Sequence, residues 1–156
     1  MDHVINVEDN YLLPTTVRLR DFLKSFDLSK LIEEVQKNTR LSEVDANELI
    51  RTHANEAYSS LALFEDINLQ NCRVLEVGSG LGFFSLFLKH CGVNIVSLEP
   101  SINGFSVFSK CRHIIIHRSK ISDLEQLDIP AENITPELAG AYSGPLGSPF
   151  LAGWDR

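Results

Sequence analysis

Three glycines at alternate positions form the part of the chain best suited to hold a ligand. Gly78, Gly80 and Gly82 follow a short apolar segment, residues 72–77, whose single acidic residue is Glu76. Glycine accepts a positive φ without steric cost and lets the backbone approach a ligand closely. A carboxylate inside an apolar strand is costly without a partner, so Glu76 faces either a structural ion pair or a ligand. A tight crossover without a ligand is the alternative reading of the glycines.

The spacing of the glycines separates two classes of nucleotide-like ligand. The dinucleotide fingerprint is G-x-G-x-x-G/A, whose third small residue lets helix and strand pack closely while the helix start faces a pyrophosphate. Here the third glycine comes one residue early, and Phe83 stands where the fingerprint needs a small residue. The sequence therefore argues against a pyrophosphate pressed on this helix.

The segment from Glu76 to Gly82, EVGSGLG, resembles motif I of the class I S-adenosylmethionine-dependent methyltransferases. It matches the E-x-G-x-G-x-G form of that motif at every fixed position. The resemblance implies that Glu76 holds the amino group of S-adenosylmethionine. It also implies that the turn lines the methionine and ribose parts of this cofactor through Gly78, Ser79, Gly80 and Gly82.

Two further acidic residues extend the resemblance. Glu99 follows the next apolar segment, and a carboxylate at that strand end can accept hydrogen bonds from two ribose hydroxyls. The segment DLEQL, which begins at Asp123, is similar to the family's D-A-x-x-L segment after the third strand. The resemblance implies that Asp123 receives the adenine amino group. Leu124 replaces the family's small residue, so a turn-capping role for Asp123 stays open.

Alternating strands and helices are needed to position these groups. Residues 72–77 and 93–98 are short, apolar and rich in β-branched side chains, which is typical of buried parallel strands. Residues 83–89 and 102–110 predict the two crossover helices, and residues 114–116, three isoleucines, predict the third strand. The predicted fold class is α/β, and the resemblance implies a Rossmann-like methyltransferase fold with strands in the order third, second, first.

A helical region is predicted before this α/β part. Apolar residues recur at helical spacing over residues 14–26 and 28–35. Ser42 with Asp45 can cap a longer helix that reaches about residue 63. In the family, such N-terminal additions often shape the pocket of the methyl acceptor, and a plain packing role is the alternative.

Two polar aromatic residues of the third predicted helix, His53 and Tyr58, are candidates to face such a pocket. The competing interpretation is an exposed histidine and a half-buried tyrosine that take no part in a site. The sequence alone does not separate these two interpretations.

The resemblance fails over residues 130–156. The family pattern needs a fourth strand here, but residues 143–149 form a Gly/Pro/Ser stretch that cannot supply a central strand. We therefore expect a helical region at 1–70, an S-adenosylmethionine-binding half-domain at 71–129 and an irregular tail at 130–156. The first strand would keep an open edge and an uncovered apolar face, which a partner chain or self-association would cover.

Three explanations fit a fold that stops after about three parallel strands: a shortened product, an engineered fragment, and a chain completed by another polypeptide. The abrupt end of the pattern in low-complexity sequence favours the first. The residues that would meet the methyl acceptor belong to the missing half, so no catalytic residue is assigned.

Composition limits the class of protein. The chain has 156 residues, with 44% hydrophobic and 22% charged content, enough for one globular domain. A net charge of −7 argues against nucleic acid as a partner, and a basic cluster over residues 110–120 is typical of a solvated helix end. Cys72, Cys91 and Cys111 have no metal-ligand spacing and predict reduced thiols. The lack of a signal peptide and of an apolar span predicts a cytoplasmic protein without a membrane segment.

Three functions follow from these observations. The first is S-adenosylmethionine-dependent methyl transfer to an unidentified acceptor, impaired in so short a chain. The second is a non-catalytic truncated product or interaction module that keeps the cofactor motif. The third, a nucleotide-binding oxidoreductase domain, is disfavoured by Phe83 and Glu76.

Overall fold

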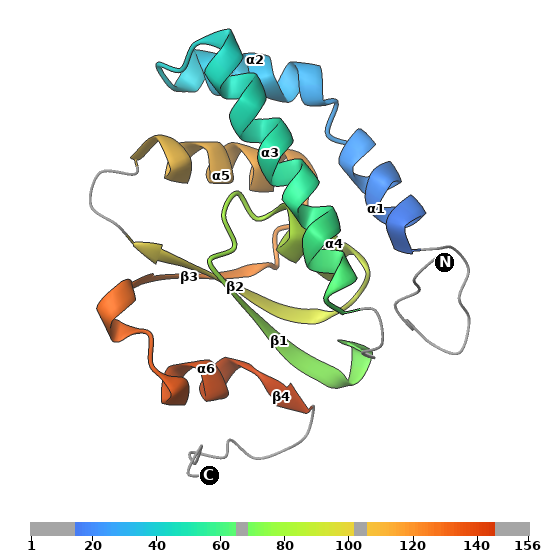
Figure 1. Cartoon of the computed structure of the whole chain (residues 1–156), viewed down its shortest axis with the longest axis vertical. Helices are drawn as coiled ribbons and strands as arrows, with labels where there is room; N and C mark the ends of the chain where they lie inside the picture. The colour runs from blue at the N-terminus through green and yellow to red at the C-terminus, as the bar shows by residue number, and fades with distance from the viewer. Residues whose placement is uncertain (1–14, 65–68, 102–105, 146–156) are drawn as a thin grey trace.

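The computed structural model describes residues 15–64, 69–101 and 106–145, and the statements below refer to these residues. Most of the helices lie on one side of a sheet, and the last helix lies on the other side (Figure 1). The elements in chain order are α1 (Thr15–Lys24), α2 (Leu28–Asn38), α3 (Glu43–Ala62), β1 (Cys72–Val77), α4 (Phe83–His90), β2 (Asn94–Ser101), α5 (Ser106–Ser119), β3 (Glu125–Pro130), α6 (Pro136–Tyr142) and β4 (Gly144–Pro145), with short 3-10 turns at Leu69–Asn71 and Ala131–Asn133.

The sheet has the order β3-β2-β1-β4. β1 and β3 both run parallel to β2, which lies between them, and Glu76 is in register with Ser97 and Glu99 with Asp128. The first three strands thus follow the predicted order of third, second, first. Since parallel strands end at the same edge of a sheet, the turn after β1 lies beside the carboxyl end of β2.

The predicted third strand is wrong. Ile114 and Ile116 lie inside α5, and the third strand is β3, further along the chain. On α5, Cys111 and Ile115 are both fully buried, and their spacing of one helical turn gives the helix a core-facing side. A short apolar run fits a buried strand and a buried helix equally well, so periodicity could not decide between them.

The helical prediction for the N-terminal region is confirmed over α1, α2 and α3. Ser42 caps α3, because its Oγ accepts a hydrogen bond from the backbone N–H of Asp45 at 3.1 Å. The hydrophobic core is continuous from these helices to the α/β part of the chain. Phe26 packs edge-to-face on Phe83 of α4, with ring centroids 5.4 Å apart. The helical layer and the α/β part therefore share one core.

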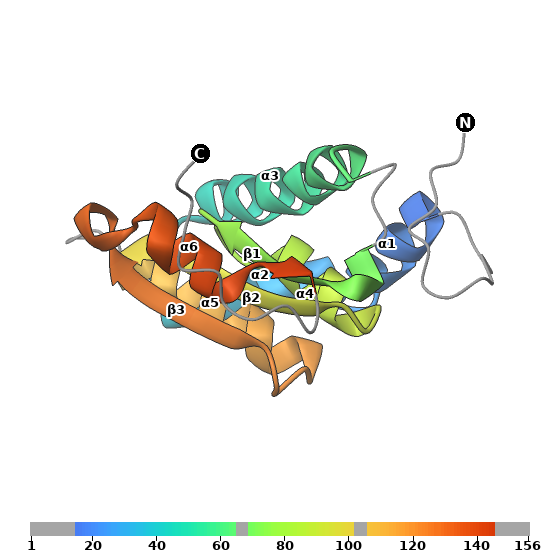
Figure 2. The same cartoon turned by 90° about the horizontal axis from the view of Figure 1, so that it is seen from below.

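The outer edge of β1 is covered over only part of its length. β4, which lies beside β1 in Figure 2, has two residues and pairs antiparallel with Cys72 and Arg73. Val77, at the other end of β1, is 50% exposed. The expected irregular tail instead contains α6, which begins at Pro136 because Thr135 caps its first turn. Residues 146–156 lie outside the described part of the chain. Within that part, no helix is both long and apolar enough to cross a membrane.

Candidate functional site

The glycine turn between β1 and α4 has a backbone that only glycine adopts without strain. Gly78, Gly80 and Gly82 have φ values of 73°, 58° and 84°. A Cβ on Gly78 would meet nothing within 4 Å, whereas a Cβ on Gly80 would lie 2.9 Å from Nδ1 of His53. The turn therefore leaves open space at its start and is in close contact with α3 at its middle.

Hydrogen bonds fix the turn to the end of β2. The backbone N–H groups of Gly78 and Ser79 donate to the carbonyl of Leu98 at 2.8 and 3.2 Å. The N–H of Gly80 donates to Oε2 of Glu99 at 2.7 Å. Glu99 therefore lies directly at the glycine turn, as the sequence predicted for an acid at this strand end.

Glu76 lies on the face of β1 that contacts α4. The Oγ of Ser85, in α4, donates a hydrogen bond to Oε2 of Glu76. Burial raises the pKa of the Glu76 carboxyl to about 7, the hydrogen bond from Ser85 opposes this rise, and the charge of Glu99 adds to it. A carboxyl group with this pKa titrates near neutral pH, and a positive ligand group beside it would favour the carboxylate.

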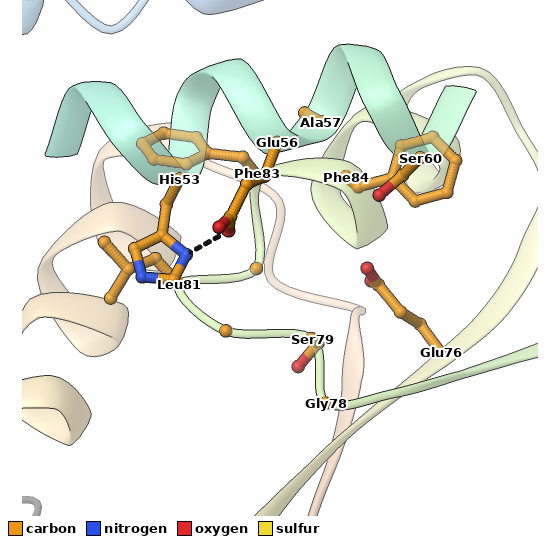
Figure 3. Close-up of a pocket in the computed structure, with 12 residues that line it drawn as sticks. His53, Glu56, Ala57, Ser60, Glu76, Gly78, Ser79, Leu81, Phe83 and Phe84 are labelled. Atoms are coloured by element: carbon orange, nitrogen blue, oxygen red, sulfur yellow. Dashed lines mark ion pairs between the residues drawn. The ribbon is translucent and has the colours of Figure 1, made fainter. Parts of the chain in front are cut away.

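Helix α3 covers the glycine turn and encloses a hollow of about 90 Å³ (Figure 3). Nδ1 of His53 is 2.9 Å from Oε2 of Glu56, one helical turn further along α3. The imidazole also packs edge-to-face on Phe108 of α5, with ring centroids 5.2 Å apart. In Figure 3, the carboxyl groups of Glu56 and Glu76 point into the hollow from opposite walls.

His53 also borders a second, more open hollow of about 440 Å³ on the outer side of α3, lined by Leu41, Asp45, Glu48, Leu49 and Thr52. Tyr58 faces elsewhere, because it lines a separate hollow with Arg20 of α1 and is partly packed on the core. Of the two polar aromatic candidates, the structure thus brings only His53 to the glycine turn.

Asp123 is not brought to the glycine turn. It precedes β3, its side chain is 74% exposed, and its Oδ2 is 3.3 Å from Nζ of Lys89 at the end of α4. The site lies at the carboxyl ends of the parallel strands, whereas Asp123 lies at their amino ends. Asp123 was expected to follow the third strand. This position is wrong because the third strand is β3, which comes after Asp123 in the chain.

Two acidic residues near the turn were missed by the sequence interpretation. Glu56 follows His53 at a spacing of three on α3, a signal visible only if the helix is known to cover the turn. Asp128 is in register with Glu99 on the neighbouring strand, and it is exposed. Its place could not be read before β3 was located.

No family model matches the chain, and neither the curated proteins nor the solved structures include a match to it. Among the residues with described positions, no group of three or more metal-binding side chains comes together. The interpretation of the site therefore depends on the residues of the glycine turn and the groups around it.

Proposed function

We propose that the glycine turn binds S-adenosylmethionine and that the chain acts in methyl transfer to an acceptor that is not identified. One observation carries this proposal: two acids lie against the turn, with Glu76 just before its start and Glu99 bonded to Gly80 in its middle. This arrangement offers one carboxyl group to a ligand amino group and another to ribose hydroxyls.

The hollow at the turn suits the amino acid end of the cofactor. Its volume of about 90 Å³ is small beside the roughly 300–1,000 Å³ of pockets that enclose a whole small molecule. An ammonium group in this hollow would offset the cost of ionising the half-buried Glu76. The nucleoside would extend beyond Gly80, toward Glu99.

Glu99 keeps capacity for a ribose. A carboxylate offers about four lone-pair sites, so the bond from Gly80 leaves acceptors for two hydroxyl groups. Phe83 supports this cofactor over a dinucleotide, because its ring packs into the core against Phe26 where a dinucleotide fold needs a small residue.

When bound, S-adenosylmethionine supplies a methyl group for displacement from sulfur by a nucleophile. The contribution of this chain would be to hold and align the reactants. The hollow on the outer side of α3 adjoins the glycine turn through His53, and we place the acceptor there. No described residue is assigned a catalytic role.

Binding measured by calorimetry tests the proposal. The full chain should bind S-adenosylmethionine saturably, and Glu99→Ala should abolish this binding. Glu99→Gln keeps an oxygen for the N–H of Gly80 but loses the charged acceptor, so it should weaken binding at least about 10-fold. Glu125→Gln, an exposed acid on β3, is the matched control and should change nothing.

Tighter binding of NAD than of S-adenosylhomocysteine would contradict the proposal, as would unchanged binding by Glu99→Gln. A second function, an interaction module, is favoured by the outer edge of β1, where β4 pairs only with Cys72 and Arg73. A partner strand would pair with the rest of that edge. A folded chain that shows no heat of binding with S-adenosylmethionine would support this second function.

A further inference from the structure

Glu56 is a second carboxyl group in the hollow, and it comes from outside the glycine motif. It belongs to α3, and its contact of 2.9 Å with Nδ1 of His53 fixes its direction. His53 in turn lies against Gly80, because a Cβ on that glycine would be 2.9 Å from the same nitrogen. Glu56 is therefore held over the middle of the turn, whereas Glu76 lies at its start, beside Ser85.

The described lining of the hollow carries two carboxyl groups and no lysine or arginine. Arg112 approaches the turn from outside this lining, where its Cγ would be 4.0 Å from a Cβ on Gly82. The hollow thus presents two separate carboxyl groups to a ligand (Figure 3).

Two separate carboxyl groups match a ligand that carries two separate positive charges, because a cation beside a carboxyl group favours its ionised form. S-adenosylmethionine has an ammonium group at its end and a sulfonium group next to the nucleoside. We propose, building on the proposed function, that Glu56 faces the sulfonium part of the ligand while Glu76 faces the ammonium group. α3 then lets the protein distinguish the charged methyl donor from its neutral-sulfur product.

The size of this effect follows from exposure. The side chain of Glu56 is 60% exposed, so water and salt screen its interaction with a nearby cation. An exposed charge pair changes an equilibrium by a few-fold rather than by orders of magnitude. We expect Glu56 to shift the ratio of donor to product affinity about 3-fold.

Calorimetry with three ligands tests this assignment on the full chain. S-adenosylmethionine carries both positive charges, S-adenosylhomocysteine carries only the positive charge of the ammonium group, and methylthioadenosine carries neither. Glu56→Gln should lower the affinity for S-adenosylmethionine about 3-fold relative to S-adenosylhomocysteine, and this difference should shrink at high salt. Glu76→Gln should weaken the binding of S-adenosylmethionine and of S-adenosylhomocysteine relative to the binding of methylthioadenosine.

Glu43→Gln is the matched control, because Glu43 is an exposed acid on α3 that lines neither hollow. It should leave all three affinities unchanged. Equal affinity changes for S-adenosylmethionine and S-adenosylhomocysteine in Glu56→Gln would overturn the role of Glu56 and leave the proposed function standing. If the wild-type chain binds none of the three ligands, the proposed function fails and this assignment fails with it.

Discussion

Gly80 and His53 form the contact through which the glycine turn and α3 depend on each other. Gly80 has a φ of 58°, and His53 is held in place by Glu56 on one side and by Phe108 on another. A side chain at Gly80 would therefore be strained and would also push the imidazole away from its partners.

We expect Gly80→Ala to lower the free energy of unfolding more than Gly78→Ala does. Both substitutions place alanine at a positive φ, which costs about 1–2 kcal/mol. Only the Gly80 variant adds a contact at 2.9 Å with His53, and we expect about 1 kcal/mol more for it. Urea denaturation measures both. In a His53→Ala background the two glycine variants should cost the same, and equal costs with His53 present would contradict the contact.

Glu76 makes stability depend on pH. Burial raises the pKa of its carboxyl from 4.5 to about 7 in the folded chain. The folded state therefore favours the protonated form, and the associated stability is fully present below about pH 4.5 and lost as pH rises through about 7. The loss amounts to about 3 kcal/mol.

The test compares the wild type with Glu76→Gln, which is neutral at every pH, by urea denaturation at pH 4.5 and pH 8. The difference in unfolding free energy between the two chains isolates Glu76 from other titrating groups. The wild type should lose stability relative to the variant as pH rises. A difference that stays constant across this range would show that the carboxyl is not shifted.

At the scale of elements, Arg118 connects α5 to α2 and to the turn between α1 and α2. It lies on α5, where its two terminal nitrogens donate hydrogen bonds at 2.9 Å to Oε2 of Glu34 on α2 and to the carbonyl of Phe26. The basic cluster expected at a solvated helix end is thus only partly solvated. Arg112 is likewise buried, whereas Lys110 and Lys120 are exposed.

We expect Arg118→Lys to lower the free energy of unfolding by about 1–2 kcal/mol, because lysine cannot reproduce the forked geometry that reaches both acceptors. Lys110→Ala, an exposed substitution on the same helix, should stay within about 0.5 kcal/mol of wild type. Chemical denaturation followed by circular dichroism measures both. Full stability in the Arg118 variant would show that the two hydrogen bonds contribute nothing net.

The assignment of residues 114–116 to α5 rather than to a third strand is also a question at the scale of elements. The elements around the turn, β1, α4 and β2, were predicted because each has a clear local pattern with a glycine boundary. Residues 114–116 have no such boundary, and the surrounding charged residues fit an amphipathic helix as well as a strand end. β3 was missed because its own sequence, EQLDIP, has little apolar content.

At the scale of the whole molecule, the helical layer and the sheet should unfold together. Phe26 is 2% exposed and contacts both Phe22 and Phe83, so it joins the N-terminal helices to α4. We expect Phe26→Ala to lower the free energy of unfolding by about 3–5 kcal/mol.

Hydrogen exchange tests the shared core. In Phe26→Ala, amide protection should fall by the same factor in α3 and in β2, since both pack on one cluster. The conservative Phe26→Leu should keep most of the protection. A loss of amide protection in α3 with full protection in β2 would show two parts that unfold independently. Such parts would correspond to a division of the chain near residue 70.

The sequence by itself determined the glycine turn, the strand before it, the helix after it and the acid at the end of β2. These features are local, because backbone conformation at glycine and the periodicity of short segments depend on neighbours in the chain. Only the tertiary structure decided which groups face the turn. It placed His53 and Glu56 over Gly80 and moved Asp123 to the opposite end of the strands. Such contacts join residues far apart in the chain, and side-chain packing across elements, rather than local pattern, selects them.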